Sequence, residues 1–292
     1  MKKEWQTLTL DEVAYPSLLK EIHDPPPSLF VRGELDLANK LVVAVVGSRK
    51  ATSYGRQAVS KIVTYLAESG VVIVSGLAFG IDAAAHEAAL AGGGVTIGVL
   101  GTPIDQIYPA SHRQLAERMI ASHGAVISEM APGTEIHRGA FPRRNRIIAG
   151  LAQITIVVEA ALASGSLITA SLALAENRDV MAVPGPITSA TSQGTNNLLK
   201  LGARVITEAN DVFELLGVPV ATGAAGPSEE KRPADQALAQ LLDFLSAAEP
   251  LHIDNLAKLA TIDLPILQGQ LTLLEIQGYI RMVQPGWYIR IA

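Results

Sequence analysis

The sequence predicts an α/β fold with an extended Rossmann-like, doubly wound and mostly parallel sheet, followed by a small C-terminal winged-helix-like domain. Short apolar runs alternate with segments of helical period, which is typical of strands buried on both faces of a parallel sheet. Hydrophobic residues make up 49% and charged residues 17% of the 292 residues, so the chain has ample material for a core. After residue 217 the composition changes, which indicates a second domain.

The first strand of the sheet is expected at 41–46, a continuous apolar run that ends at Gly47. The next segment, 54–69, has a helical period that places Ala58, Ile62 and Leu66 on one face. Further strands are expected at 71–74, 95–100, 125–128, 154–158, 180–183 and 204–206. The helices between them are expected at 81–91, 113–122, up to about 151, 166–177, 196–201 and 211–216.

Four regions follow from this pattern. Residues 1–40 are expected to form an N-terminal arm packed on the main domain, irregular over 5–39 except for a short helix from Tyr15 and a strand at 29–33. Residues 41–217 form the Rossmann-like domain, and 218–234, rich in Gly, Pro, Ala and charge, form a linker. Residues 235–292 contain three helical segments and a hairpin, which is a winged-helix outline.

The winged-helix-like region is acidic, and its third helix, 264–277, has no cation. A recognition helix for duplex DNA should be basic. The charge of this region therefore indicates that it contacts another protein or covers a surface, rather than that it reads duplex DNA.

Composition excludes several classes of protein. The absence of cysteine excludes a disulfide framework, a thiol nucleophile and a zinc site built on Cys, and it fits a reducing cytoplasm. No apolar stretch follows Lys2 and Lys3, and no uncharged apolar run reaches the ~20 residues that span a bilayer. The histidines lack metal-ligand spacing, and no Walker or dinucleotide fingerprint is present. We therefore expect a cytoplasmic protein with no membrane span, no metal and no cofactor.

A basic stretch, 137–150, stands out in a chain of net charge −5. It carries His137, Arg138, Phe141, Pro142, Arg143, Arg144, Asn145 and Arg146, and it predicts an anion-binding loop that enters a helix. Arginine offers a fixed fork for phosphate oxygens, and a base stacked on Phe141 contributes ~1–3 kcal/mol. The alternative is an internal network in which the arginines pair with Glu129, Glu135 and Glu159.

Two further loops leave strand ends and are expected at the same edge of the sheet, because ligands of such folds bind outside the carboxyl ends of the strands. Ser48, Arg49 and Lys50 follow the first strand and offer a hydroxyl, two cations and backbone N–H groups for a phosphate. Ser164, Gly165 and Ser166 cap a helix and leave N–H groups toward this edge. Asp82 and His86, one helical turn apart, favour a structural role over acid–base work.

These segments together resemble the DNA processing protein A family, DprA/Smf. The motifs are YP at 15–16 with DPP at 24–26, VGSR at 46–49, SGLAFGID at 75–82, FPRRNRIIAG at 141–150, VEA at 158–160 with SGSLITA at 164–170, and AVPG at 182–185. By motif, the resemblance implies that Ser48, Arg49, residues 141–146 and residues 164–166 line a positively charged pocket for single-stranded DNA. Lys50 completes the expected DNA-binding set.

The resemblance also implies no known catalytic activity. Family members protect incoming single strands during natural transformation, help to displace single-strand binding protein and load the recombinase RecA. They form homodimers through the Rossmann domain. The expected partners are therefore single-stranded DNA, RecA, single-strand binding protein and a second copy of the chain.

Two rival functions stay open. A Rossmann-type hydrolase or transferase of a nucleotide or its phosphoribose would use the same basic pocket, with Glu159 or Asp82 as the acid–base group. The Pro-Gly-Gly-x-Gly-Thr loop of related hydrolases is missing, because the chain has Pro184-Gly185-Pro186 and, separately, Gly194-Thr195. The other rival is a module that binds RecA and for which DNA is secondary.

Overall fold

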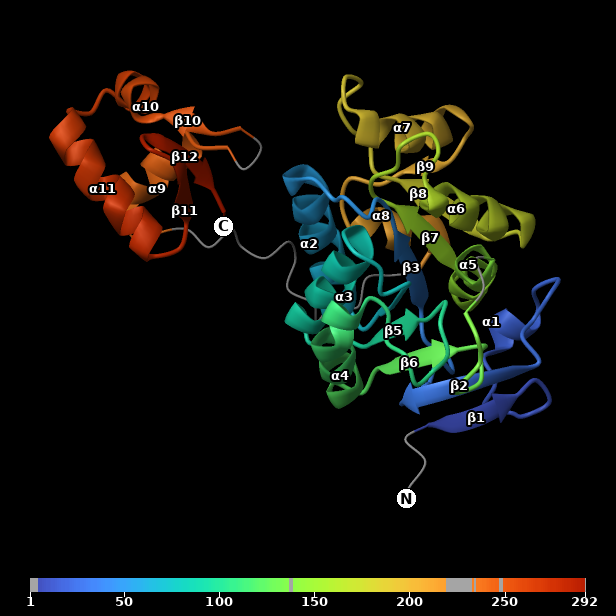
Figure 1. Ribbon diagram of the computed structural model, residues 1–292. Coiled ribbons are helices and arrows are strands. Elements are labelled where there is room, and N and C mark those ends of the chain that lie inside the picture. Colours follow the sequence, from blue (N-terminus) through green and yellow to red (C-terminus); the bar gives the residue numbers. More distant parts are fainter. Residues whose placement is uncertain (1–4, 137–138, 219–232, 234, 247–248, 292) are drawn as a thin grey trace. The chain divides into compact units, whose positions relative to one another are not determined.

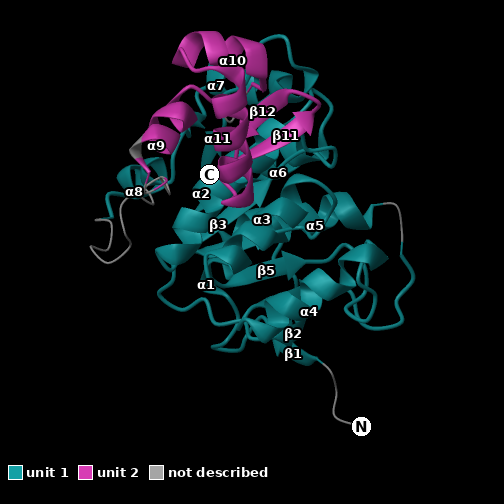
Figure 2. Ribbon diagram, turned by 90° about the vertical axis from the view of Figure 1, so that its left-hand side faces the viewer, with its two compact units in different colours: residues 1–224 teal, residues 225–292 magenta. Residues whose placement is uncertain are grey.

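The computed structural model describes residues 5–136, 139–218, 233, 235–246 and 249–291 (Figure 1). The chain divides into two compact units, residues 1–224 and residues 225–292 (Figure 2). The basic residues His137 and Arg138 and most of the expected linker 218–234 lie outside the described residues. None of the helices within the described ranges combines the length and apolarity needed to cross a bilayer.

A nine-stranded sheet, counted over the described residues, forms the centre of the first unit (Figure 1). Its order is β1-β2-β6-β5-β4-β3-β7-β8-β9, and the strands from β6 to β9 are parallel. The parallel strands are β3 (Val42–Val46), β4 (Val72–Ser75), β5 (Thr96–Val99), β6 (Ala125–Ser128), β7 (Ile154–Val157), β8 (Asp179–Ala182) and β9 (Arg204–Val205). This topology confirms the predicted doubly wound, mostly parallel fold.

The two faces of the sheet are covered by different helices, and β3 shows the alternation. Val42, Ala44 and Val46 pack in one core with α1 (Ser17–Lys20), α5 (Ala140–Leu151) and α6 (Gly165–Ala175). Val43 and Val45 pack in a second core with α2 (Ser53–Glu68), α3 (Ile81–Ala91) and α8 (Asn210–Leu216). Because both faces are buried here, β3 is apolar at every position rather than alternating.

The remaining helices of the first unit lie toward the ends of the sheet. A smaller core around Leu77, Leu100 and Met119 anchors α4 (Arg113–Ala121), and the short 3-10 helix η1 (Ala110–His112) directly precedes α4 in the chain. The helix α7 (Gln193–Lys200) contacts β8 and follows the 3-10 helix η2 (Ala190–Ser192).

The N-terminal arm belongs to the sheet. The strand β2 (Ser28–Gly33) pairs antiparallel with β6, and β1 (Gln6–Thr9) pairs antiparallel with β2 at the edge. The expectation of an irregular chain before residue 29 is wrong for β1. Only Leu8 of that strand is buried, so its sequence lacks the apolar run that marks the other strands.

The direction of winding reverses at β3, since β4, β5 and β6 follow on one side and β7, β8 and β9 on the other. The carboxyl ends of β3 and β7 are adjacent because these two strands are paired. In doubly wound sheets this switch point opens a crevice for a ligand.

The second unit has the predicted winged-helix elements. Its helices are α9 (Gln236–Asp243), α10 (Ile253–Ala260) and α11 (Leu264–Ile276), and its sheet has the order β10-β12-β11. The strands are β10 (Leu251–His252), β11 (Ile280–Gln284) and β12 (Trp287–Arg290). Leu241, Leu256, Leu271 and Ile280 lie in its separate core.

Candidate functional site

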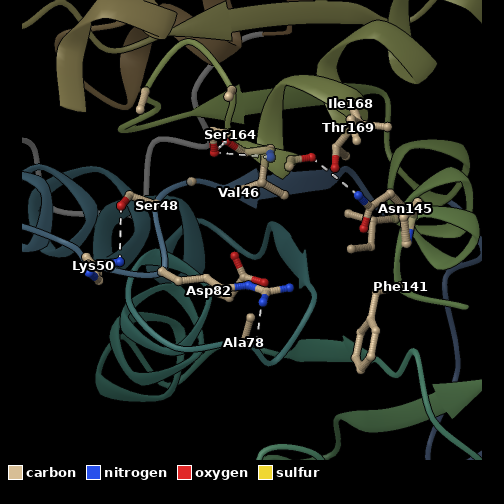
Figure 3. A pocket seen from close by; sticks show the side chains of 18 of the residues that line it. Val46, Ser48, Lys50, Ala78, Asp82, Phe141, Asn145, Ser164, Ile168 and Thr169 are labelled. Carbon is tan, nitrogen blue, oxygen red and sulfur yellow. Dashed lines mark hydrogen bonds between the residues drawn. The ribbon is translucent and has the colours of Figure 1, made fainter. Parts of the chain in front are cut away.

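A cavity of about 660 Å³ lies at the switch point, beyond the carboxyl ends of β3 and β7 (Figure 3). Ten of the predicted site residues line it: Ser48, Arg49, Lys50, Phe141, Pro142, Arg144, Asn145, Ser164, Gly165 and Ser166. Three segments far apart in the sequence therefore meet at one site, as expected from their positions at strand ends. Arg143 and Arg146, also predicted, do not line this cavity.

The loop after β3 supplies two cations. The hydroxyl oxygen of Ser48 accepts the backbone N–H of Lys50 at 3.1 Å, and the carbonyl of Ser48 accepts the N–H of Ile81 at 3.1 Å, so the loop is held in place. The side chains of Arg49 and Lys50 are exposed, and within the described part of the chain no carboxylate forms an ion pair with either. Both cations are thus available to an anion in the cavity.

The N-terminus of α6 forms the opposite wall. The Ser164 side chain caps the helix by accepting the N–H of Ser166 at 3.4 Å, and the two hydroxyls are 2.7 Å apart. A Cβ added to Gly165 would meet nothing within 4 Å, so the backbone here faces open space. First-turn N–H groups that lack partners within a helix attract anions.

Phe141 and Pro142 enter the cavity from the first turn of α5, where a proline costs no hydrogen bond. The predicted stretch 137–150 does enter a helix, and this helix, α5, begins at Ala140 and so already includes Phe141. The Phe141 ring packs against Tyr108 with ring centroids 5.5 Å apart. Asn145, one turn later, donates from Nδ2 to the Gly165 carbonyl at 3.4 Å and so connects α5 to α6.

Arg144 forms the floor of the cavity. It is only 7% exposed, and its Nη1 donates to the carbonyl of Gly76 at 2.7 Å and to the carbonyl of Val99. Burial lowers the pKa of Arg144 to about 10, while Asp82 opposes this shift and Arg49 adds to it. The guanidinium therefore stays charged at neutral pH and joins the ends of β4 and β5. It also borders a second, smaller cavity of about 340 Å³.

Arg143 and Arg146 form an internal ion-pair network with Glu129. Arg146 Nη2 is 2.6 Å and Arg143 Nη2 is 3.2 Å from Glu129 Oε1, and Arg146 Nε is 2.9 Å from Asp24 Oδ2. Burial opposes the charge of Arg146, but the bonds to Glu129 and Asp24 outweigh it and raise the pKa of Arg146. Of the three carboxylates in the alternative of internal pairing, Glu129 therefore pairs with both arginines.

The two carboxylates considered as acid–base groups differ in position. Asp82 lines the cavity, where its Oδ2 accepts the N–H groups of Gly76 at 3.1 Å and Ala78 at 3.4 Å, and burial raises its pKa. Glu159 is buried outside the cavity. It accepts the Thr52 N–H at 2.9 Å and hydroxyl at 2.5 Å and the Thr191 hydroxyl at 3.3 Å.

His86 does not pair with Asp82. Its Nδ1 lies 2.7 Å from the Thr96 hydroxyl, which itself donates to the Ile73 carbonyl at 2.9 Å, so Nδ1 carries the proton. Asp82 and His86 are therefore separate buried groups. Across the described residues, no group of three or more His, Asp or Glu is placed to hold a metal ion.

The sequence pattern missed several residues of the cavity wall. Thr169 and Ile168 line it from the first turns of α6, and Thr191 lines it from η2. Thr191 follows the loop 184–186, which leaves a strand end, and this position in the chain is the sequence feature that could have identified it as a site residue. Ile168 and Thr169 carry no charge, so nothing in their residue types distinguishes them from ordinary helix residues.

Comparison with known proteins agrees with this architecture. The family described as DNA recombination-mediator protein A matches residues 6–217, and the DprA winged helix domain matches residues 224–284. The chain belongs to the DprA/Smf family. Among its relatives in the DprA/Smf family, Protein Smf of Escherichia coli is 40% identical over 286 residues, which cover 96% of this chain and 76% of that protein.

Solved structures of DprA/Smf proteins share the fold of the first unit. DNA processing protein A from Streptococcus pneumoniae is 44% identical, with a TM-score of 0.68 over 73% of this chain and 74% of that chain. DNA processing protein A from Helicobacter pylori, whose structure concerns a single-stranded DNA binding mode, is 33% identical. Its TM-score is 0.64 over 74% of this chain and 98% of that chain.

Proposed function

We propose that this protein binds single-stranded DNA in the switch-point cavity, catalyses no reaction there, and delivers the strand to RecA. The observation that carries the proposal is a pair of cations, Arg49 and Lys50, that have no ion-pair partner among the described residues and line the same cavity as the N-terminus of α6. Family membership supports it, since a relative from H. pylori is known for its single-stranded DNA binding mode.

The chemistry of the cavity suits a strand rather than a small reactive substrate. Arg49, Lys50 and the first-turn N–H groups of α6 bind phosphate oxygens, and the buried charge of Arg144 adds a positive field from below. Phe141 stacks on a base. Because all bases have a π-face, this arrangement is tolerant of sequence.

Fluorescence anisotropy with labelled oligo-dT and a matching duplex, over a salt series, tests the proposal. We expect tight binding of the single strand and weak binding of the duplex. The logarithm of the binding constant should fall linearly with the logarithm of the salt concentration, since each neutralised phosphate releases counterions. Absence of single-strand binding at low salt would refute it.

Two arginine variants separate binding from stability. Arg49→Ala should reduce affinity and lower the salt slope by about 0.7, the value for one phosphate contact on a single strand, with no loss of stability. Arg146→Ala should instead destabilise the fold by about 2–3 kcal/mol, because Glu129 loses its closest partner, although the exposed Asp24 limits the loss. Lys61→Ala, an exposed cation on α2 that does not line the cavity, controls for the loss of one charge.

Anisotropy and urea unfolding of the same samples distinguish these outcomes. An Arg49→Ala protein that unfolds earlier, or binds as tightly as the parent, would contradict the assignment of this side chain to DNA.

The wider role that we propose is that of a recombination mediator in natural transformation. It would protect incoming single strands in the cytoplasm, help to displace single-strand binding protein, load RecA, and act as a homodimer. The lack of cysteine agrees with a reducing compartment.

RecA loading is tested by RecA ATPase activity on single strands coated with single-strand binding protein. We expect the parent protein to shorten the lag and Arg49→Ala to do so less. A pull-down of RecA with and without DNA tests the rival of a RecA-binding module, because DNA-independent capture by a variant that has lost DNA binding would favour that rival.

Asp82 supports the second candidate function, a nucleotide or phosphoribose hydrolase. It is a buried carboxylate with a raised pKa in the cavity wall, which is one property of a general acid. However, its Oδ2 already accepts two backbone N–H groups, which is typical of a structural role. Release of free base from nucleoside monophosphates, lost in Asp82→Asn, would establish the hydrolase.

A further inference from the structure

Two pairs of aromatic rings lie beside the cavity. Phe141 packs on Tyr108 with ring centroids 5.5 Å apart, and Phe79 packs edge-on against His112 with centroids 5.0 Å apart. Tyr108 and His112 stand at the two ends of the short segment that includes η1, so one loop connects both pairs. We call these four rings the aromatic track.

Both ends of the aromatic track are fixed to the cavity rim. A Cβ on Gly101 would come within 2.6 Å of the Phe141 ring, so the start of the loop lies directly against that ring. A Cβ on Gly80 would come within 2.2 Å of the Ser48 carbonyl, so the turn after Phe79 lies against the cationic loop. Figure 3 shows Ala78, next to Phe79 in the chain, on the rim between Lys50 and Phe141.

Rigid support lies beneath the aromatic track. His112 Nδ1 is 2.8 Å from the Leu77 carbonyl, and Leu77, Ile104 and Leu115 are buried in the core below. The track is therefore a fixed surface of the fold, continuous with the cavity.

Two rings of the aromatic track are half open to solvent. Phe79 is 50% and Tyr108 is 55% exposed, although aromatic residues make up only 4% of the chain. A ring that packs on one side and is half exposed offers the other side to a flat partner. Cations flank the Phe79–His112 pair, Arg49 and Lys50 in the loop beside Gly80 and Arg113 directly after His112, while Asp105 is the acidic residue of the loop 101–112.

We propose that a single strand leaving the cavity continues along the aromatic track, where its bases stack on Tyr108 and Phe79. The inference rests on the proposed function and adds to it a path for the strand along the cavity rim. Unstacked bases present their faces to aromatic side chains, whereas the bases of a duplex are already stacked on one another. The track therefore also gives the protein a means to discriminate against duplex DNA.

A length series of labelled oligo-dT tests the track. In the parent protein, affinity should rise with length beyond the oligomer that fills the cavity. In the double variant Phe79→Leu/Tyr108→Leu, short oligomers should bind as before, and long ones should bind about tenfold more weakly for each ring removed. Tyr108→Phe keeps the ring and should therefore keep the contribution of that ring to affinity. Phe244→Leu, which removes a ring of similar exposure in the second unit, is the matched control.

Photocrosslinking of the parent protein gives an independent measurement that needs no variant. A long oligo-dT with 4-thiothymine near one end should form adducts on the peptides that contain Phe79 and Tyr108, and mass spectrometry locates them. Adducts only elsewhere, or an unaltered length dependence in the double variant, would overturn the track while leaving cavity binding intact. Failure of the short oligomers to bind the parent protein would instead refute the proposed function and the track together.

Discussion

His86 shows how burial alone sets a pH dependence. The side chain is fully buried, and burial, with the nearby His112 and Arg144, lowers its pKa from 6.5 to about 3. Its Nε2 has no partner within the described residues. The unfolded chain therefore takes up a proton at this residue in a pH range where the folded protein does not.

Acidification from pH 6.5 toward about pH 3 should destabilise the fold. Stability contributed by neutral His86 is fully present above pH 6.5 and is lost as the pH falls toward about 3, at about 1.4 kcal/mol per pH unit. The free energy of unfolding, measured with urea at a series of pH values, should depend on pH less steeply in His86→Leu by this amount. Equal slopes in the parent protein and in His86→Leu would contradict the assignment.

The sequence predicted ten of the twenty residues that line the cavity, but not their roles. Ser48, Arg49 and Lys50 were found because they follow a strand, and strand ends share an edge. Arg146 looks identical to Arg49 in the sequence, yet it pairs with Asp24, which is 122 residues away in the chain. Which arginine faces solvent depends on such distant contacts, and a single sequence does not contain them.

At the scale of one element, α6 offers its N-terminus to the cavity through Gly165. A Cβ there has open space, so packing does not require glycine at this position. Alanine should stabilise the helix by as much as about 1 kcal/mol. If phosphates approach this backbone, the added methyl group obstructs them, and Gly165→Ala should bind single strands more weakly while melting at a higher temperature.

Gly269→Ala is the matched control, because Gly269 lies within α11, has open space and does not line the cavity. It should gain stability without losing affinity. Thermal melts and anisotropy of both variants measure the two effects, and a Gly165→Ala protein with unchanged affinity would exclude close approach of the DNA to this helix end.

Elements were predictable where their burial is uniform. The helix α3 was expected at 81–91 and spans Ile81–Ala91, because an apolar face and flanking glycines mark both ends. The strand β1 was missed because it is an edge strand with only Leu8 buried. The rings of Tyr108 and Phe79 were missed for a similar reason, since single aromatic residues in loops have no periodicity.

At the scale of the whole molecule, the proposed homodimer needs a surface on the Rossmann unit. The strand β9 is an edge of the sheet, and Leu201 and Val205 are exposed beside and within it. Exposed edges with apolar side chains favour pairing with another chain. Leu201→Glu/Val205→Glu should weaken a dimer by more than about tenfold, from the loss of two buried aliphatic side chains.

Sedimentation velocity over a concentration series measures this change. Val13→Glu, on the N-terminal arm and fully exposed, is the control and should keep the oligomeric state of the parent protein. Since neither Leu201 nor Val205 lines the cavity, binding of short oligomers should persist in the double variant. An unaltered dimer would place the interface on another surface.

The buried Glu159 has a consequence for how quickly a strand is captured. Its carboxylate links the start of α2, through Thr52, to the loop that carries Thr191, and it fills the space beside Gly55. The loops on either side of the switch point are thus braced against each other before any ligand arrives. We therefore expect capture without an opening step, at a rate set by diffusional encounter that the local positive charge accelerates.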